Sequence, residues 1–151
     1  MGLKVAINGF GRIGRLVYRA ILESKIADLE VVCINDLGST SSNAHLLKYD
    51  STHGILPHKI IVGENTIDAG QGSVTITSER DPSNLPWREL DVDIAFECTG
   101  FFASKDKASA HITAGAKRVI VSAPASGADI TVVYGVNDHL KNKDLKNLKN
   151  K

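Results

Sequence analysis

The sequence predicts an α/β protein with a doubly wound, mostly parallel sheet and a small antiparallel insertion. Three observations support this fold class. Short apolar segments alternate along the chain with segments whose apolar residues recur at helical spacing. The first apolar segment runs directly into a glycine-rich turn and a helix. Between residues 58 and 77, short apolar runs are separated by glycine-containing turns, which is typical of antiparallel hairpins.

The first predicted unit is a strand over residues 3–8 that is followed directly by a helix. The strand segment is short and apolar, as is typical of strands buried on both faces of a parallel sheet. The face of the helix that packs on this strand is predicted from the apolar residues at helical spacing. These are Ile13, Leu16, Val17, Ala20 and Ile21. The three arginines of the helix are expected to face elsewhere, and they are Arg12, Arg15 and Arg19.

The later elements alternate in the same way. A second strand over residues 30–34 ends at Asn35 and Asp36, and a right-handed crossover places it parallel to the first strand. A short helix is predicted over residues 43–50. The remaining predicted elements are strands at 58–62, 66–68 and 73–77 in the insertion, a strand at 93–97, a helix at about 104–113, and strands at 118–121 and 130–133.

Length and composition fit one folded domain. The chain has 151 residues, of which 42% are hydrophobic and 23% are charged, close to the average of globular proteins. Its longest apolar runs span only a few residues, far short of the roughly 20 that cross a bilayer. No secretory signal pattern is found at the N-terminus. We therefore expect a cytoplasmic protein without a membrane partner.

The charge of the chain is unevenly distributed. Net charge is +1, but residues 141–151 contain five lysines and one aspartate, so this segment carries +4 and the rest of the chain −3. Dispersed lysines at a chain end are more often a solvated, frayed helix than a nucleic-acid-binding surface. We expect no nucleic-acid partner. Residues 1–137 are expected to form the folded domain, and residues 138–151 a low-complexity basic tail.

The turn between the first strand and its helix carries three glycines at the spacing of a phosphate-binding turn. Gly9 permits a tight turn, Gly11 lets a phosphate approach the backbone, and Gly14 lets the helix pack closely on the strand. The unpaired amides near Arg12 and Ile13, together with the positive end of the helix dipole, favour a pyrophosphate there. The turn therefore predicts a dinucleotide site in a Rossmann-type domain, against the alternative of an ordinary glycine turn.

Asp36 stands at the end of the second predicted strand, 22 residues beyond Gly14. A carboxylate at this point can accept hydrogen bonds from the hydroxyls of an adenosine ribose, and it would repel a 2′-phosphate. No arginine follows in residues 37–40 to neutralise such a phosphate. The sequence therefore favours NAD over NADP as the cofactor, the alternative being that Asp36 only caps a turn.

Ordered motifs extend this pattern along most of the chain. Residues 5–15 read VAINGFGRIGR, and the later motifs are His45–Gly54, Glu79–Pro82, Leu85–Trp87, Glu97–Gly100, Ala114–Lys117 and Val121–Pro124. In this order they resemble the phosphorylating glyceraldehyde-3-phosphate dehydrogenases, and the resemblance covers about Leu3 to Asn137. It implies a NAD-binding Rossmann domain and the oxidation of an aldehyde with reduction of NAD.

The resemblance also assigns the contacts of the dinucleotide by position. With the glycine turn and Asp36 included, the cofactor-binding residues that it implies are Asn8, Gly9, Phe10, Gly11, Arg12, Ile13, Gly14, Asp36, Arg80, Thr99, Gly100, Phe102 and Ser122. In the family's arrangement Arg80 borders the adenine, Thr99, Gly100 and Phe102 line its pocket, and Ser122 approaches the nicotinamide. Simpler explanations exist: Arg80 can cap a turn with Asp81, Phe102 can belong to the core, and Ser122 can end a strand.

The family's reaction uses a cysteine thiolate that attacks the aldehyde and a histidine that activates the thiol. The resemblance places both in stretches beyond Asn137, the cysteine in a Ser-Cys-Thr-Thr-Asn motif, and neither stretch occurs in these 151 residues. Cys33 and Cys98 lie in or at the end of apolar strands and are expected to be structural thiols. The five histidines show no metal or triad spacing. We therefore predict no catalytic residue and no metal site in this chain.

The leading hypothesis is that the chain is the cofactor-binding part of a glyceraldehyde-3-phosphate dehydrogenase, with a truncated or replaced end and the catalytic domain absent. Alone it would be inactive. Glyceraldehyde 3-phosphate and phosphate would be its partners only if a catalytic domain is supplied. Two alternatives stay open: the same domain of an erythrose-4-phosphate dehydrogenase, and a stand-alone NAD-binding or interaction module without turnover. Apolar surface left uncovered would favour a homo-oligomer.

Overall fold

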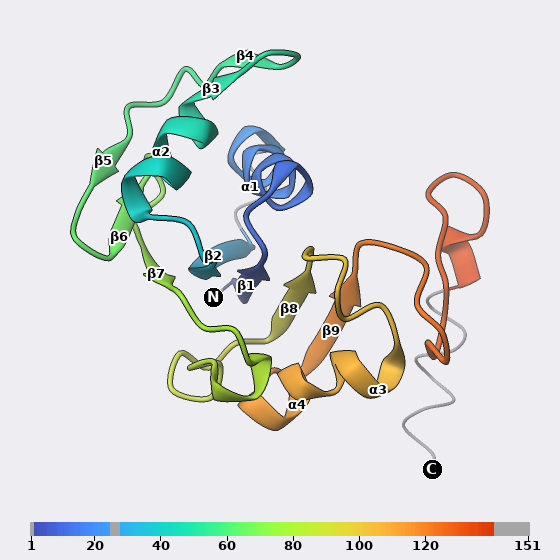
Figure 1. The fold of residues 1–151 in the computed structure, drawn as a ribbon. Coiled ribbons are helices and arrows are strands. Elements are labelled where there is room, and N and C mark those ends of the chain that lie inside the picture. Colours follow the sequence, from blue (N-terminus) through green and yellow to red (C-terminus); the bar gives the residue numbers. More distant parts are fainter. Residues whose placement is uncertain (1, 25–27, 141–151) are drawn as a thin grey trace.

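The protein is built on one seven-stranded sheet with the strand order β5-β6-β7-β2-β1-β8-β9. A computed structural model describes residues 2–24 and 28–140 and shows helices on both faces of this sheet (Figure 1). Two short strands form one edge in antiparallel pairing, namely β5 (Ile61–Val62) and β6 (Thr66–Asp68). The other strands pair in parallel, and they are β1 (Leu3–Asn8), β2 (Leu29–Asn35), β7 (Ser73–Thr77), β8 (Ile94–Glu97) and β9 (Arg118–Val121).

Helices cover the two faces of the sheet. On one face lie α1 (Arg12–Ser24) and α2 (Thr40–Lys48), and on the other lie α3 (Lys105–Ala108) and α4 (Ala110–Ala114) (Figure 1). The shorter elements are the 3-10 turns η1 (Pro82–Asn84) and η2 (Asp138–Leu140), and a two-stranded ribbon of β3 (Tyr49–Asp50) and β4 (Gly54–Ile55). No helix in the described part of the chain is long and apolar enough to span a bilayer.

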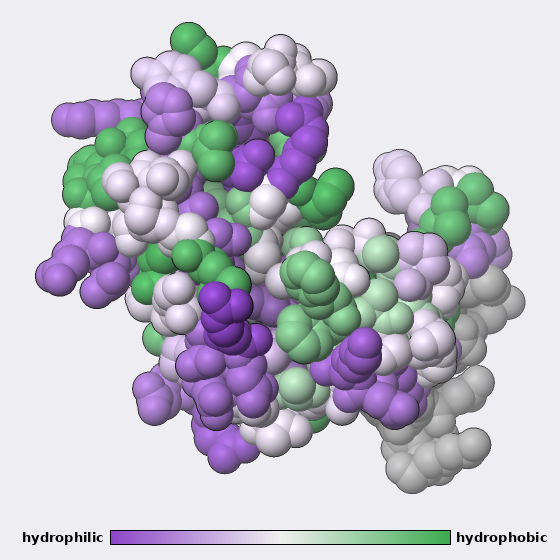
Figure 2. Space-filling view, viewed as in Figure 1, coloured by the Kyte–Doolittle hydropathy of each residue, from purple (hydrophilic) through white to green (hydrophobic). Residues whose placement is uncertain are grey.

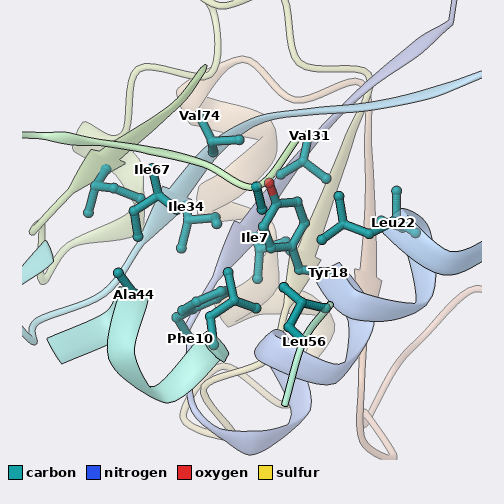
Figure 3. Close-up of a cluster of buried hydrophobic side chains, with 14 residues drawn as sticks. Ile7, Phe10, Tyr18, Leu22, Val31, Ile34, Ala44, Leu56, Ile67 and Val74 are labelled. Atoms are coloured by element: carbon teal, nitrogen blue, oxygen red, sulfur yellow. The ribbon is translucent and has the colours of Figure 1, made fainter. Parts of the chain in front are cut away.

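Strand alternation divides the buried residues into two cores, one on each face of the sheet. Ile7 and Ile34 belong to the core beneath α1 and α2 (Figure 3). Their strand neighbours Ala6 and Cys33 belong to the second core, which also contains the indole of Trp87. Both faces of the central strands are therefore covered, as a parallel sheet requires.

The chain adds strands to the sheet first on one side of β1 and later on its other side. The chain passes from β1 to β2 on one side, and it returns later to β8 on the other side of β1. Ligands of doubly wound folds bind at such a switch point, outside the carboxyl ends of the strands. The space-filling view shows a notch between α1 and the segment after β9, above the carboxyl ends of β8 and β9 (Figure 2).

The predicted fold class is confirmed, and so are most of the predicted elements. Residues 3–8, 66–68, 73–77 and 118–121 form strands with the predicted bounds. The antiparallel insertion is also confirmed, and its last strand joins the main sheet because β7 pairs with β2. Only two residues of the predicted strand 58–62 are paired, Ile61 with Asp68 and Val62 with Ile67 of β6.

Two predictions about elements are wrong. Residues 130–133 form no strand, and Val133 is 53% exposed in a loop whose hydrogen bonds to Asn137 are local. Their β-branched residues favour extended structure, but no neighbouring strand pairs with them. The predicted helix 104–113 is divided at Ser109, whose hydroxyl donates to the carbonyl of Asp106. The predicted tail falls on residues 138–151, of which 141–151 lie outside the described residues.

The buried face of α1 also differs from the prediction. Ile13 is 50% exposed, whereas Arg19, which was expected to face away from the sheet, is only 4% exposed. The guanidinium of Arg19 donates to the carbonyl oxygens of Leu47, Lys48 and Gly54 at 2.7–3.1 Å. These carbonyls stand at the C-terminal end of α2 and the start of β4, so Arg19 connects α1 to both elements.

Candidate dinucleotide-binding site

The glycine turn runs from Gly9, directly after β1, to Gly14 in the first turn of α1, and two of its positions leave no room for a side chain. Gly9 has a φ of +91°, and a β-carbon there would lie 2.9 Å from the amide nitrogen of Thr99. A β-carbon at Gly14 would collide with the carbonyl oxygen of Gly9. At Gly11, by contrast, nothing lies within 4 Å of the position of a β-carbon. The turn is therefore closed toward the sheet and open where a phosphate would approach.

The amide groups at the start of α1 are free to bind a ligand. The amide of Arg15 donates to the carbonyl of Gly11, and among the described residues the amides of residues 11–14 have no hydrogen-bond partner. Four unpaired amides and the positive end of the helix dipole favour an anion such as a pyrophosphate. The side chain of Arg12 is engaged elsewhere, since it pairs with Asp50 at 3.1 Å.

Asp36 follows β2 and faces the glycine turn. Its Oδ1 accepts the amide of Phe10 at 2.9 Å, and its Oδ2 accepts the amide of Gly38 at 2.9 Å. A carboxylate has about four acceptor positions, so both oxygens can still accept a ribose hydroxyl. A cavity of about 550 Å³ lies next to this loop, lined by residues 37–41, 62–65 and 76–78. The fold thus places Asp36 between the glycine turn and a loop that lines this cavity.

The segments after β7, β8 and β9 carry the other predicted contacts. These are Arg80, Thr99, Gly100, Phe102 and Ser122. Arg80 and Ser122 are exposed, and Gly100 is exposed with a φ of +79°. Phe102 is half-buried and belongs to neither core. The cap of η1 is the side chain of Asp81, which leaves the guanidinium of Arg80 out of that turn.

Asn8 and Phe10 lie at the predicted site but direct their side chains into the protein. Phe10 is 1% exposed and packs in the core beside Tyr18, with ring centroids 6.2 Å apart (Figure 3). Asn8 is 3% exposed, and its side chain is held by hydrogen bonds with Glu97 and Asn35. Both side chains therefore shape the turn from the protein side.

A buried glutamate beneath the site is absent from the sequence-based prediction. Glu97 is the last residue of β8 and is 0% exposed; its carboxylate accepts hydrogen bonds from Asn8, His111 and Thr99 at 2.7–2.8 Å. Burial raises the pKa of Glu97, but the hydrogen bonds from His111, Thr99 and Asn8 outweigh it and hold the pKa below its usual value. A glutamate ending an apolar strand, followed by a histidine in the next helix, is the signal that could have indicated this pair.

The pKa values of both cysteines are raised. Burial raises the pKa of Cys33 to about 11. Burial also raises the pKa of Cys98 to about 11. The negative charge of Glu97 raises this pKa further, whereas the hydrogen bond with Ser122 lowers it. Reactive cysteines have lowered pKa values, so both thiols fit the predicted structural role.

Several of these features occur together in one class of protein. An open helix start at the switch point of a doubly wound sheet, with an acidic residue on the neighbouring strand end, defines a dinucleotide-binding domain. Residues 3–105 match the family described as glyceraldehyde 3-phosphate dehydrogenase, NAD binding domain, and the chain belongs to that family. NAD is accordingly the cofactor of the domain.

The chain is also similar to curated dehydrogenases over most of its length. The glyceraldehyde-3-phosphate dehydrogenase of Xanthobacter flavus is 61% identical over 146 residues, which are 96% of this chain and 44% of the relative. That of Thermotoga maritima is 55% identical over 139 residues, 91% of this chain and 42% of the relative. That of Mycoplasma pneumoniae is 52% identical over 145 residues, 95% and 42%. The chain therefore spans about two fifths of the length of the curated relatives it matches.

Proposed function

We propose that this chain holds NAD for the phosphorylating oxidation of glyceraldehyde 3-phosphate in glycolysis, in keeping with relatives that are named glyceraldehyde-3-phosphate dehydrogenase. The proposal rests chiefly on the hydrogen bond from the amide of Phe10 to Oδ1 of Asp36, at 2.9 Å. This bond fixes an acidic side chain beside the open start of α1. The same site thereby offers amides to a pyrophosphate and a carboxylate to a ribose.

The proposed contacts divide the dinucleotide among several strand ends. The amides of residues 11–14 hold the pyrophosphate, and Asp36 accepts the hydroxyls of the adenosine ribose. Arg80, Thr99, Gly100 and Phe102 border the adenine, and Ser122 lies toward the nicotinamide. Asn8 and Phe10 support the turn from inside. NAD, when bound, supplies the acceptor for the hydride that leaves the substrate.

The chain alone is proposed to be inactive. With pKa values of about 11, Cys33 and Cys98 are protonated at neutral pH, so neither supplies a thiolate to attack the aldehyde. Glyceraldehyde 3-phosphate and phosphate become substrates only where another domain supplies the nucleophile. We expect the 151-residue chain, mixed with NAD and both substrates, to form NADH no faster than a protein-free blank. Sustained turnover would contradict this proposal.

Substitution of Asp36 tests the assignment of the ribose contact. Asp36→Asn keeps the size of the side chain and removes its negative charge. We expect NAD to bind about tenfold more weakly, because charge-assisted hydrogen bonds to the ribose are lost. The preference for NAD over NADP should also fall, because the 2′-phosphate is no longer repelled. Calorimetric titration of the full chain with both dinucleotides measures the two effects.

Asp68→Asn is the matched control for Asp36→Asn. Asp68 also holds a turn, since it accepts the amides of Gly70 at 2.7 Å and Gly72 at 3.3 Å. That turn precedes β7, which runs parallel to β2, so it lies at the amino edge of the sheet, opposite the site. The affinity of Asp68→Asn for NAD should equal that of the wild type. An equal loss in both variants would argue against a ribose contact by Asp36.

A further inference from the structure

Glu97 is a fully buried carboxylate whose partners are all neutral. Oε2 accepts the side-chain amide of Asn8 and Nε2 of His111, each at 2.7 Å. Oε1 accepts the main-chain amide of Thr99 at 2.8 Å and the hydroxyl of the same residue. A buried carboxylate is unfavourable unless its oxygens are hydrogen-bonded, and here four donors satisfy it.

The hydrogen bond between Trp87 and His111 fixes the state of the imidazole. Nε1 of Trp87 lies 2.9 Å from Nδ1 of His111, and an indole nitrogen can only donate. Nδ1 must therefore accept, so the ring proton is on Nε2, which donates to Glu97. His111 is neutral in this arrangement, and Glu97 keeps its negative charge.

Apart from His111, the donors to Glu97 come from two segments, the end of β1 at the glycine turn and the segment after β8. Asn8 is the residue before Gly9. Thr99 packs against that glycine, because a β-carbon on Gly9 would lie 2.8 Å from the methyl group of Thr99. By holding Asn8 and Thr99 with one carboxylate, Glu97 fixes the end of β1 against the end of β8.

The hydrogen bonds that connect Trp87, His111, Glu97 and Asn8 form a row. This row continues across the sheet from Asn8 to Asn35 and Glu79. The amide group of Asn35 donates to Oδ1 of Asn8 at 2.8 Å and to the carbonyl of Glu79 at 2.8 Å. Asn35 also accepts the main-chain amide of Glu79 at 2.8 Å. Asn35 precedes Asp36, and Glu79 precedes Arg80. Three proposed contacts beyond the ends of β1, β2 and β7 therefore each follow directly a residue of this row, and they are Gly9, Asp36 and Arg80.

The sign of its charge excludes an attractive role for Glu97. A buried negative charge close to the glycine turn would repel a pyrophosphate, so direct electrostatic attraction cannot explain its place there. What the carboxylate supplies is acceptor capacity: it takes four hydrogen bonds where an amide oxygen would take at most two. No uncharged side chain of this size can replace that number of acceptor positions.

We propose that Glu97 is a positioning residue for dinucleotide binding, which acts through Thr99 and Asn8 on the glycine turn and through Asn35 on Asp36. The proposal rests on the function proposed above, since the contacts that Glu97 positions are those proposed for NAD. Glu97 itself does not touch the dinucleotide. His111 holds the carboxylate in place from α4.

The test compares Glu97→Gln with Val92→Ala in the 151-residue chain. The substituted side chain would present an amide group to donors, so at least one hydrogen bond of the row is lost in Glu97→Gln. We expect NAD to bind about tenfold more weakly, by calorimetric titration at a temperature where the variant is folded. Val92 is buried in the same core as Trp87 but does not belong to the row of hydrogen bonds. Val92→Ala should lower the stability and leave the dissociation constant of NAD unchanged.

The indole N–H resonance of Trp87 distinguishes a positioning role of Glu97 from a purely structural one. It is the only tryptophan of the chain, so its indole N–H gives a single NMR resonance, and that N–H donates to His111. Saturation with NAD should shift this resonance in the wild type, because the row connects Trp87 to the turn. In Glu97→Gln the shift should be reduced or absent.

Each outcome of this test is decisive. If the wild type does not bind NAD, the proposed function fails. If the wild type binds and Glu97→Gln binds equally well, the positioning role fails alone. If Glu97→Gln does not fold, His111→Leu decides, because it removes one donor to Glu97 from outside the site. We expect His111→Leu to bind NAD several-fold more weakly, and unchanged affinity would overturn the proposal.

Discussion

At the scale of single residues, Glu97 links the protonation of one buried group to the stability of the fold. Burial disfavours its charged form, but hydrogen bonds from His111, Thr99 and Asn8 favour it and lower its pKa. The folded pKa therefore lies below the unfolded value of about 4.3 for a glutamate. The lowered pKa stabilises the folded state at any pH above the pKa of the unfolded state. This stabilisation is lost as the pH falls through the pKa of the folded state.

The pH dependence of unfolding tests this linkage. At neutral pH, Glu97→Gln should lower the free energy of unfolding by about 1–3 kcal/mol, because buried donors lose an acceptor. The difference between wild type and variant should shrink as the pH falls from the unfolded value of about 4.3 through the lower pKa of the folded state. Urea unfolding of both proteins between about pH 3 and 7 measures it. A difference that grows on acidification would contradict the hydrogen bonding described for Glu97.

At the scale of elements, α1 forms part of the site with its first turn and is anchored to the fold by its middle. Its first turn presents free amides at the site, while Arg19 in its middle donates to three carbonyls at the end of α2 and in β4. The last carbonyls of a helix have no partner within the helix, and a cation beside them is favourable. Arg19 therefore anchors the helix whose start forms the site.

Removal of Arg19 should destabilise the fold. Arg19→Met keeps a long apolar side chain and removes both hydrogen bonds to the buried carbonyl of Leu47, so we expect a loss of about 1–3 kcal/mol in the free energy of unfolding. Arg118→Met is the control, because Arg118 lies exposed on β9. Urea unfolding of the two variants measures the difference. Losses of similar size would show that the buried hydrogen bonds of Arg19 contribute little.

The sequence predicts the elements whose formation depends on local pattern. The apolar run of β1, the glycine turn and the insertion hairpins are found at or close to the predicted positions. Arg19 and the pair Glu97 and His111 depend instead on partners distant in the chain, so the rule that charged residues face solvent fails for them. The segment 130–133 has the composition of a strand but no strand beside it, and composition alone cannot show that.

At the scale of the whole molecule, the strand order places every proposed contact at one edge. Because these strands run parallel, their carboxyl ends lie at the same edge of the sheet, and they are β1, β2, β7, β8 and β9. Residues as distant in sequence as Asp36 and Ser122 therefore lie on the same side of the sheet. The sequence predicts a site at the carboxyl ends of the strands, because alternating strands and helices form a parallel sheet. The buried row of hydrogen bonds beneath the site follows only from the packed structure.

The central claim is that the open start of α1 and Asp36 together bind NAD. Calorimetric titration of the 151-residue chain with NAD and with NADP, in the same buffer, tests it most directly. We predict one NAD bound per chain, with NADP at least about tenfold weaker because Asp36 repels the 2′-phosphate. Absence of NAD binding, or a preference for NADP, would contradict the account.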